Sequence, residues 1–170
     1  MALVEAILQE FDQEAKTTRR VLERVPGDKL SWKPHPRSMS IGELALHLAA
    51  APGLIIDWVP PPVTDLPGGP HTPQPSSVTE ILSAHEQSVS KVKNTLTRIG
   101  DAGLQGTSEI KIGGATLMTI PKMGLVRSIV LNHWIHHRGQ LSVYLRLLDV
   151  PVPAIYGPSA DENPFAVAMA

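Results

Sequence analysis

The sequence predicts an all-α protein, a four-helix bundle with a long proline- and glycine-rich loop and an irregular C-terminal tail. Four segments carry apolar residues at spacings of three and four, the period of an amphipathic helix. Proline and glycine separate these segments, and a chain of 170 residues that is 42% hydrophobic can bury one core. We therefore expect residues 1–170 to form a single domain.

Composition excludes several classes of protein. The formal net charge of −1 argues against a general nucleic-acid-binding protein, which would present a basic face. The chain has no cysteine, so it has neither disulfides nor thiolate metal sites, and a cytoplasmic location is expected. An acidic residue follows within five positions of the N-terminus, and His47, Pro52 and Asp57 interrupt the apolar stretch 44–59. We thus expect no signal peptide and no membrane partner.

The first two helices have clear end signals. The first is expected over residues 2–25, where Pro26 and Gly27 stop it. The second starts at Ser40, because Ser40 followed by Glu43 forms a capping box before an apolar run. It is expected to continue to about residue 58, with a kink at Pro52.

Residues 60–75 are rich in proline and glycine and are expected to form a loop. Ser77 and Glu80 repeat the capping-box pattern at the start of a third helix, which Gly100 is expected to end. The following pattern is weaker. Residues 108–120 are compatible either with two short strands that turn at Gly113 and Gly114 or with a loop.

The fourth helix is expected from about Pro121 to residue 149, since proline suits a first helical turn. Pro151 and Pro153 follow it, and the tail 151–170 has no regular pattern. This helix contains the residues with the strongest chemical signal. His133 and His137 are four residues apart and point the same way from successive turns, a geometry that suits two imidazole ligands of one metal ion.

A third candidate ligand, His47, lies between two leucines on the core face of the second helix. Three histidines leave a tetrahedral or octahedral ion with an open position, which is typical of a catalytic rather than a structural metal site. His136 could compete with His137, but it is offset from the apolar face. A lone histidine on such a face is more often a hydrogen-bonded core residue, and histidine pairs arise by chance on helix surfaces. Three imidazoles in one small core favour a metal, which would satisfy one nitrogen of each.

Two further residues are candidates for catalytic support. Gln140 lies on the same helix face as the histidine pair, where it could bond a ligand or substrate or simply contact a neighbouring helix. His85 lies on the core face of the third helix and could be a fourth ligand, a proton shuttle or a hydrogen-bonded core residue, the last being favoured. Arg138 is interpreted as a structural ion-pair donor.

Two segments carry a family resemblance. Residues 30–49, LSWKPHPRSMSIGELALHLA, and residues 131–162, which contain the string HWIHHRGQ, resemble the second helix and the fourth helix with its tail in the DinB-like, or YfiT-like, metalloenzyme family. The resemblance implies a four-helix bundle in up-down-down-up order, often dimeric. It implies metal ligands at His47, His133 and His137. It also implies nickel or zinc, and in some members iron or manganese. Some members carry an acidic residue shortly after the second-helix histidine, whereas this chain has Ala51 there.

The sequence therefore predicts a divalent-metal-dependent enzyme that acts on a small molecule. The resemblance suggests a hydrolase or a low-molecular-weight-thiol S-transferase that forms a homodimer. Two alternatives remain open: a non-enzymatic bundle that binds metal or dimerises, and a small-ligand binder without metal.

Overall fold

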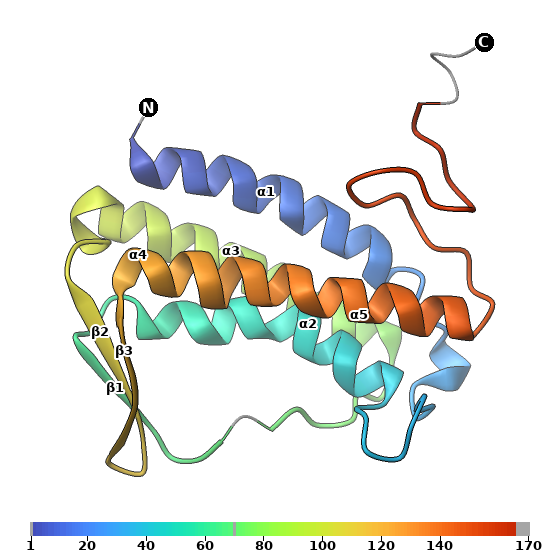
Figure 1. Ribbon diagram of the computed structural model, residues 1–170, viewed down its shortest axis with the longest axis horizontal. Coiled ribbons are helices and arrows are strands. Elements are labelled where there is room, and N and C mark those ends of the chain that lie inside the picture. The colour runs from blue at the N-terminus through green and yellow to red at the C-terminus, as the bar shows by residue number, and fades with distance from the viewer. Residues whose placement is uncertain (1, 70, 166–170) are drawn as a thin grey trace.

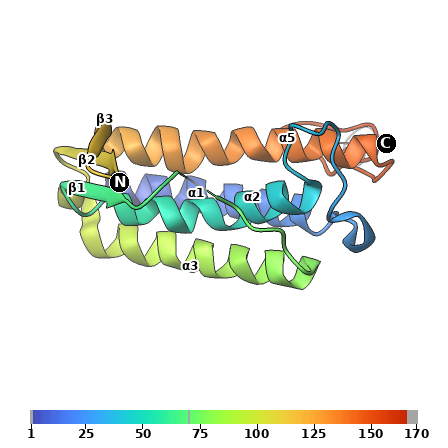
Figure 2. The same cartoon turned by 90° about the horizontal axis from the view of Figure 1, so that it is seen from below.

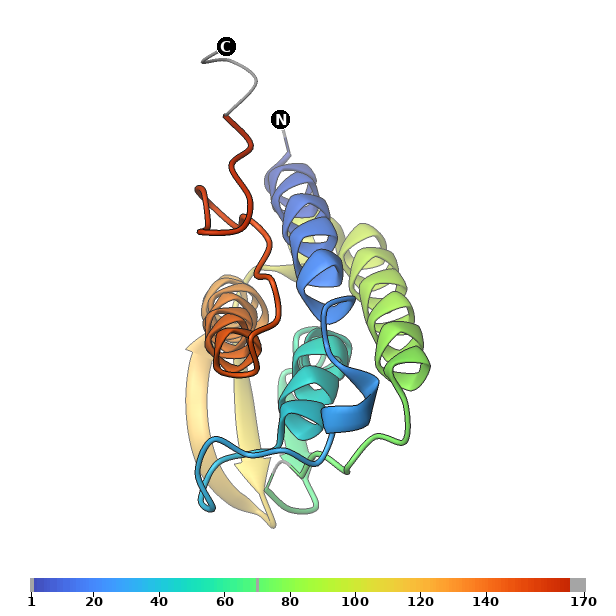
Figure 3. The ribbon, with the colours of Figure 1, turned by 90° about the vertical axis from the view of Figure 1, so that its right-hand side faces the viewer.

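The computed structural model describes residues 2–69 and 71–165. Four long helical segments lie side by side, and a small sheet closes one end of the bundle (Figures 1 and 2). Viewed along the bundle, the four segments surround a common core (Figure 3). The segments are α1 (Leu3–Leu22), α2 (Ile41–Ile55), α3 (Val78–Gly103) and a last run that ends in α5 (His133–Leu147).

The end of α3 caps the start of α1. No side chain near the first turn of α1 supplies a cap, and the Asp101 carboxylate instead accepts hydrogen bonds from the backbone N–H groups of Leu3 and Val4, at 3.0 and 2.8 Å. These bonds favour the ionised form and lower the pKa of Asp101. Gly100 breaks the helical geometry at a φ of 58°, but helical residues continue to Gly103, beyond the end predicted at Gly100.

Helix α2 begins as predicted. The Ser40 hydroxyl accepts from the Glu43 backbone N–H, and the Glu43 carboxylate accepts from the Ser40 backbone N–H, which completes the capping box. The pattern at Ser77 is only half formed, because the Glu80 carboxylate accepts from Ser76 instead.

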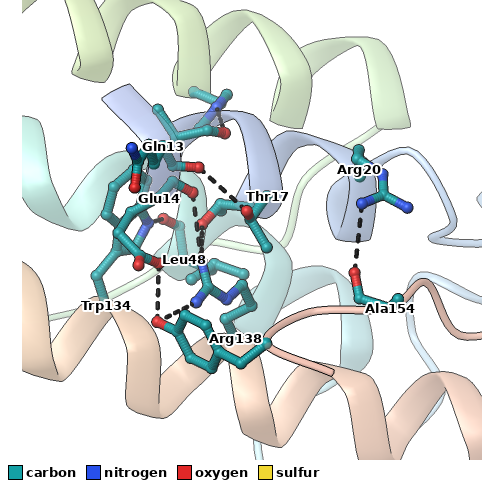
Figure 4. A network of polar contacts seen from close by, with 12 residues as sticks. Gln13, Glu14, Thr17, Arg20, Leu48, Trp134, Arg138 and Ala154 are labelled. Carbon is teal, nitrogen blue, oxygen red and sulfur yellow. Dashed lines mark hydrogen bonds and ion pairs between the residues drawn. The ribbon is translucent and has the colours of Figure 1, made fainter. Parts of the chain in front are cut away.

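Pro52 shapes the contact between α2 and α5. Because proline has no N–H, the Leu48 carbonyl four residues earlier lacks its helical partner. The Trp134 indole N–H donates to that carbonyl at 2.7 Å (Figure 4). Trp134 is buried and stacks on Phe11, with ring centroids 5.0 Å apart. A single indole therefore fixes α5 against both α2 and α1, next to the candidate metal ligands on each side.

Gly53 lets α2 approach α3 closely. Its backbone N–H donates to the Ser88 hydroxyl at 2.7 Å. A Cβ atom at position 53 would lie 2.8 Å from the Ser88 Cα, so only glycine fits without a backbone shift.

The last helical run begins with the short helix α4 (Lys122–Gly124), with Pro121 directly before it, and it ends at Leu147, two residues before the predicted end. Residues Leu125–Asn132 between α4 and α5 form a π-helical segment, η3. Such wide turns inside helices are often found near functional sites. The α-helical spacing resumes at His133, so the histidine pair itself lies in regular α-helix.

A three-stranded sheet corrects the all-α prediction. Strand β2 (Thr107–Ile112) pairs antiparallel with β3 (Ala115–Pro121), and Gly113 and Gly114 occupy the turn with positive φ values of 56° and 82°. The strand alternative for residues 108–120 is therefore confirmed. Strand β1 (Val63–Leu66) pairs parallel with β2, so the prediction that residues 60–75 are entirely loop was wrong. Its partner lies more than forty residues away in the sequence, and no local pattern announced the pairing.

The connection from α2 to α3 runs back along the bundle (Figure 2).

The stretch Ile41–Trp58 is long and apolar enough to cross a membrane by length and composition, yet 67% of it is buried inside the protein. Its hydrophobicity is thus accounted for by the bundle core.

The C-terminal tail is irregular as predicted over residues 151–165, while residues 166–170 lie outside the described part. Its carboxylates hold it to the bundle. Glu162 pairs with Arg20 on α1, and Asp161 pairs with Arg146 on α5. The Tyr156 hydroxyl lies 2.6 Å from Arg138 and 2.9 Å from Glu14.

Candidate metal centre

His47, His133 and His137 come together from α2 and α5. One ring nitrogen of each lies within 4.8 Å of the others, and all three side chains are half-buried. The ring centroids are 4.5 Å apart for His47 and His137, 5.3 Å for His47 and His133, and 4.4 Å for His133 and His137. Within the described chain this is the one group of histidine and acidic residues that meets this distance criterion.

The closest ring nitrogens fit a shared ion. The Nε2 atoms of His133 and His137 are 2.9 Å apart. Two nitrogens bonded to one ion at about 2.0–2.1 Å each lie about 3 Å apart. Two lone pairs at this separation repel unless a proton or a cation lies between them. The arrangement therefore suits a divalent metal.

Partners on the other ring nitrogens orient two of the imidazoles. The Gln140 side-chain oxygen lies 2.7 Å from Nδ1 of His137, so this nitrogen carries the proton and Nε2 keeps its lone pair. The Thr72 hydroxyl lies 3.1 Å from Nδ1 of His47. Hydrogen bonds of this kind fix the tautomer and rotation of a ligating histidine.

Burial keeps the three imidazoles neutral, as metal ligation requires. Desolvation, followed by the neighbouring histidines, lowers the pKa of His47 to about 4. The same causes lower the pKa of His133 to about 4. Desolvation also lowers the pKa of His137, although the bond to Gln140 opposes it. At neutral pH, each ring therefore offers a lone pair.

The three histidines line an open cavity of about 560 Å³. Its other walls come from the loop before α2, which contributes Lys33 and Arg37, and from His71 and Thr72 in the connection after β1. A small molecule can thus reach the point where the imidazoles converge. No signal in the sequence pointed to these wall residues, because the loops that carry them lack a periodic pattern.

The other candidates are separated from this site or support it. Gln140 supports it through His137. His85 is buried and its Nε2 lies 3.2 Å from the Ala15 carbonyl oxygen on α1, which matches the favoured core role. Its Nδ1 has no partner among the described residues, and it is not part of the three-histidine group. His136 is exposed, as its offset position predicted.

Arg138 is structural, as predicted. It is 1% exposed and pairs with the Glu14 carboxylate of α1 at 2.6 Å (Figure 4). It also donates to the Thr18 hydroxyl and to the Glu14 backbone oxygen, each at 3.2 Å. The guanidinium thus joins α5 to α1.

The sequence model of the DinB family matches residues 1–164. The chain belongs to the DinB family. A curated relative is the uncharacterized protein YrdA of Bacillus subtilis (strain 168), 28% identical over 156 residues that span 91% of this chain and 89% of YrdA.

Two solved structures of DinB-like proteins share the fold. One, from Bacillus cereus ATCC 10987, superposes with a TM-score of 0.72 at 23% identity and covers 89% of this chain and 97% of its own. The other, YjoA from Bacillus subtilis, has a TM-score of 0.66 at 18% identity and covers 92% and 98%. At these identities the likeness establishes the DinB fold and leaves the chemistry to be argued from the site itself.

Proposed function

We propose that this DinB-family protein binds one divalent metal ion through His47, His133 and His137 and catalyses a reaction of a small molecule at the open side of that ion. The observation that carries the proposal is the convergence of three neutral imidazoles at the wall of an open cavity of about 560 Å³. Three protein ligands and an accessible remaining position are typical of catalytic rather than structural metal sites.

The ligand set favours anionic donors in the open position. The group contains no carboxylate, so the ligands do not offset the charge of the ion. A divalent ion in this setting acts as a Lewis acid and lowers the pKa of the group that it meets. The protein's own part is to hold the imidazoles neutral and, through Gln140 and Thr72, to orient two of them.

This chemistry supports either hydrolysis or the transfer of a low-molecular-weight thiol to an electrophile. Both reactions need a nucleophile, water or a thiol, whose pKa the metal lowers, and neither needs a protein cysteine. Nickel or zinc is the expected ion, since imidazole ligands suit both. The up-down-down-up helix order and a homodimer in the cytoplasm complete the proposal and follow from the family resemblance.

Metal analysis of protein purified without a nickel column tests the first step. We expect about one equivalent of metal per chain, and a His133→Ala variant that loses the metal but keeps its helical circular dichroism. His136→Ala is the matched control, because His136 is exposed on the same helix and the variant should retain the metal. Loss of metal from both variants, or from neither, would contradict the assigned ligands. Unfolding of His133→Ala would favour a structural metal instead.

A thiol-transfer assay tests the reaction. The metal-loaded protein is mixed with a low-molecular-weight thiol and monobromobimane, and product fluorescence is followed. A rate above that of the metal-stripped protein is expected for a transferase. Equal rates would exclude transfer of that thiol and leave hydrolysis as the proposed class.

A further inference from the structure

The loop that precedes α2 forms a charged wall beside the three histidines. Lys33 and Arg37 from this loop line the same cavity as His47, His133 and His137, and Glu43 is the one carboxylate among the described residues that line it. A ligand in this cavity would contact the metal with one atom and these charged residues with a second group. The charges of the wall therefore indicate the chemistry of that second group.

The charges of this wall are not balanced. The Glu43 carboxylate accepts from the Ser40 backbone N–H at 2.6 Å and lies 3.4 Å from the Lys33 ammonium. Lys33 and Glu43 thus offset each other. Arg37 is exposed, and within the described residues its one hydrogen bond uses the backbone N–H, so its side chain has no ion pair or hydrogen bond there. The wall therefore carries one net positive charge, from the exposed residue Arg37 that lines the cavity.

Hydrogen bonds fix the loop backbone at Arg37 before any ligand arrives. Its ends are joined by the hydrogen bond from the Ile41 N–H to the Trp32 carbonyl, at 2.9 Å. The Arg37 backbone N–H donates to Nδ1 of His35 at 3.2 Å, and Pro36 restricts the backbone just before it. A fixed backbone leaves only the side chain of Arg37 to lose conformational entropy when a ligand binds, which favours affinity.

We infer that Arg37 binds a carboxylate of the substrate, so that the proposed enzyme acts on small organic acids whose second functional group meets the metal. This inference rests on the proposed function. A guanidinium pairs with a carboxylate through two parallel hydrogen bonds. Arg37 contributes a single positive charge, which one carboxylate neutralises, while the second functional group meets the charge of the ion.

Two thiols that differ in one group test the inference. The full-length protein is loaded with cobalt(II), and the absorbance band of a cobalt-bound thiolate reports binding of 4-mercaptobutyrate or of its uncharged analogue 4-mercaptobutanol. We expect the acid to bind about tenfold to a hundredfold more tightly than the alcohol, the range for a hydrogen-bonded charge pair. Equal affinities within twofold would overturn the inference and leave the proposed function standing.

Variants assign the preference to the arginine. Arg37→Gln should remove the preference for the acid and leave the affinity for the alcohol within twofold, and Arg37→Lys should restore part of it. Arg98→Gln is the matched control, because it removes the same charge from an exposed site on α3 that does not line this cavity. Loss of the preference in the Arg98 variant, or its persistence in Arg37→Gln with unchanged circular dichroism, would overturn the role of Arg37. No thiolate band with either probe would overturn the inference, because neither thiol then reaches the metal, and would leave hydrolysis as the proposed class.

Discussion

The buried ion pair between Arg138 and Glu14 makes a sharp test of how α5 is held in the bundle. The change is Arg138→Met, which keeps a long apolar side chain and removes the guanidinium. Arg138 is 1% exposed, and the side chain of Glu14 is 11% exposed. The variant therefore leaves a carboxylate buried without its cation.

The expected loss of stability follows from these contacts. Breaking a buried ion pair by removing one partner costs about 3–5 kcal/mol. The Tyr156 hydroxyl still donates to the Glu14 carboxylate at 2.9 Å, which places the expected loss near the lower end, about 3 kcal/mol. For a chain of this size, such a loss lowers the melting temperature by about 6–12 °C.

The assay is urea unfolding of the metal-free protein followed by circular dichroism, so that metal binding adds nothing to the measured free energy of unfolding. Arg127→Met is the matched control, because Arg127 pairs with Glu10 between the same helical run and α1, but both side chains are exposed. Exposed pairs contribute about 0–1 kcal/mol. The double variant Glu14→Gln with Arg138→Met should recover much of the stability that Arg138→Met loses.

A loss for Arg138→Met no larger than that for Arg127→Met would refute the reasoning. So would a double variant whose loss equals the sum of the two single losses, since it would show that the two side chains are not coupled.

Three further predictions concern the packing around the site and the buried histidine of α3. Trp134→Phe should lower the free energy of unfolding by about 1–3 kcal/mol in urea titrations, because the Leu48 carbonyl loses its partner, and an unchanged value would contradict the role of the indole N–H. Gly53→Ala should cost about 1–3 kcal/mol in the same assay, because the added methyl meets the Ser88 backbone at 2.8 Å. Burial lowers the pKa of His85 to about 4 from an unfolded value of 6.5, so the unfolded chain takes up the proton first. Stability contributed by the neutral ring is complete above pH 6.5 and is lost as the pH falls toward 4, by about 3 kcal/mol in total. The stability difference between wild type and His85→Gln should therefore narrow over this range in unfolding curves measured at each pH, and a constant difference would argue against the shift.

Local signals in the sequence were enough to predict the helices. The capping box at Ser40 and Glu43 is a short-range motif, and it forms as predicted because both partners lie in one turn. The same motif at Ser77 was only half right. Its Glu80 carboxylate has a competing donor in Ser76, and sequence spacing does not rank two nearby donors. Strand β1 was missed because its backbone partners lie on β2, far along the chain.

The sequence by itself determined which imidazoles share a helix face. The spacing of four between His133 and His137 sets their directions once the segment is helical, and His47 between leucines marks a core-facing position. Helical geometry fixes such relations within one element, whatever surrounds it.

Only the tertiary structure decided that the two helices meet with these three rings around one point. The distance between His47 and the histidine pair on α5 depends on how α2 packs against α5. In that contact the Trp134 indole donates to the Leu48 carbonyl, which Pro52 leaves without a helical partner, and these two residues are 86 positions apart. The same holds for Thr72 and Arg37, which reach the site from loops. Side-chain positions across helices depend on packing between distant segments, which no local pattern encodes.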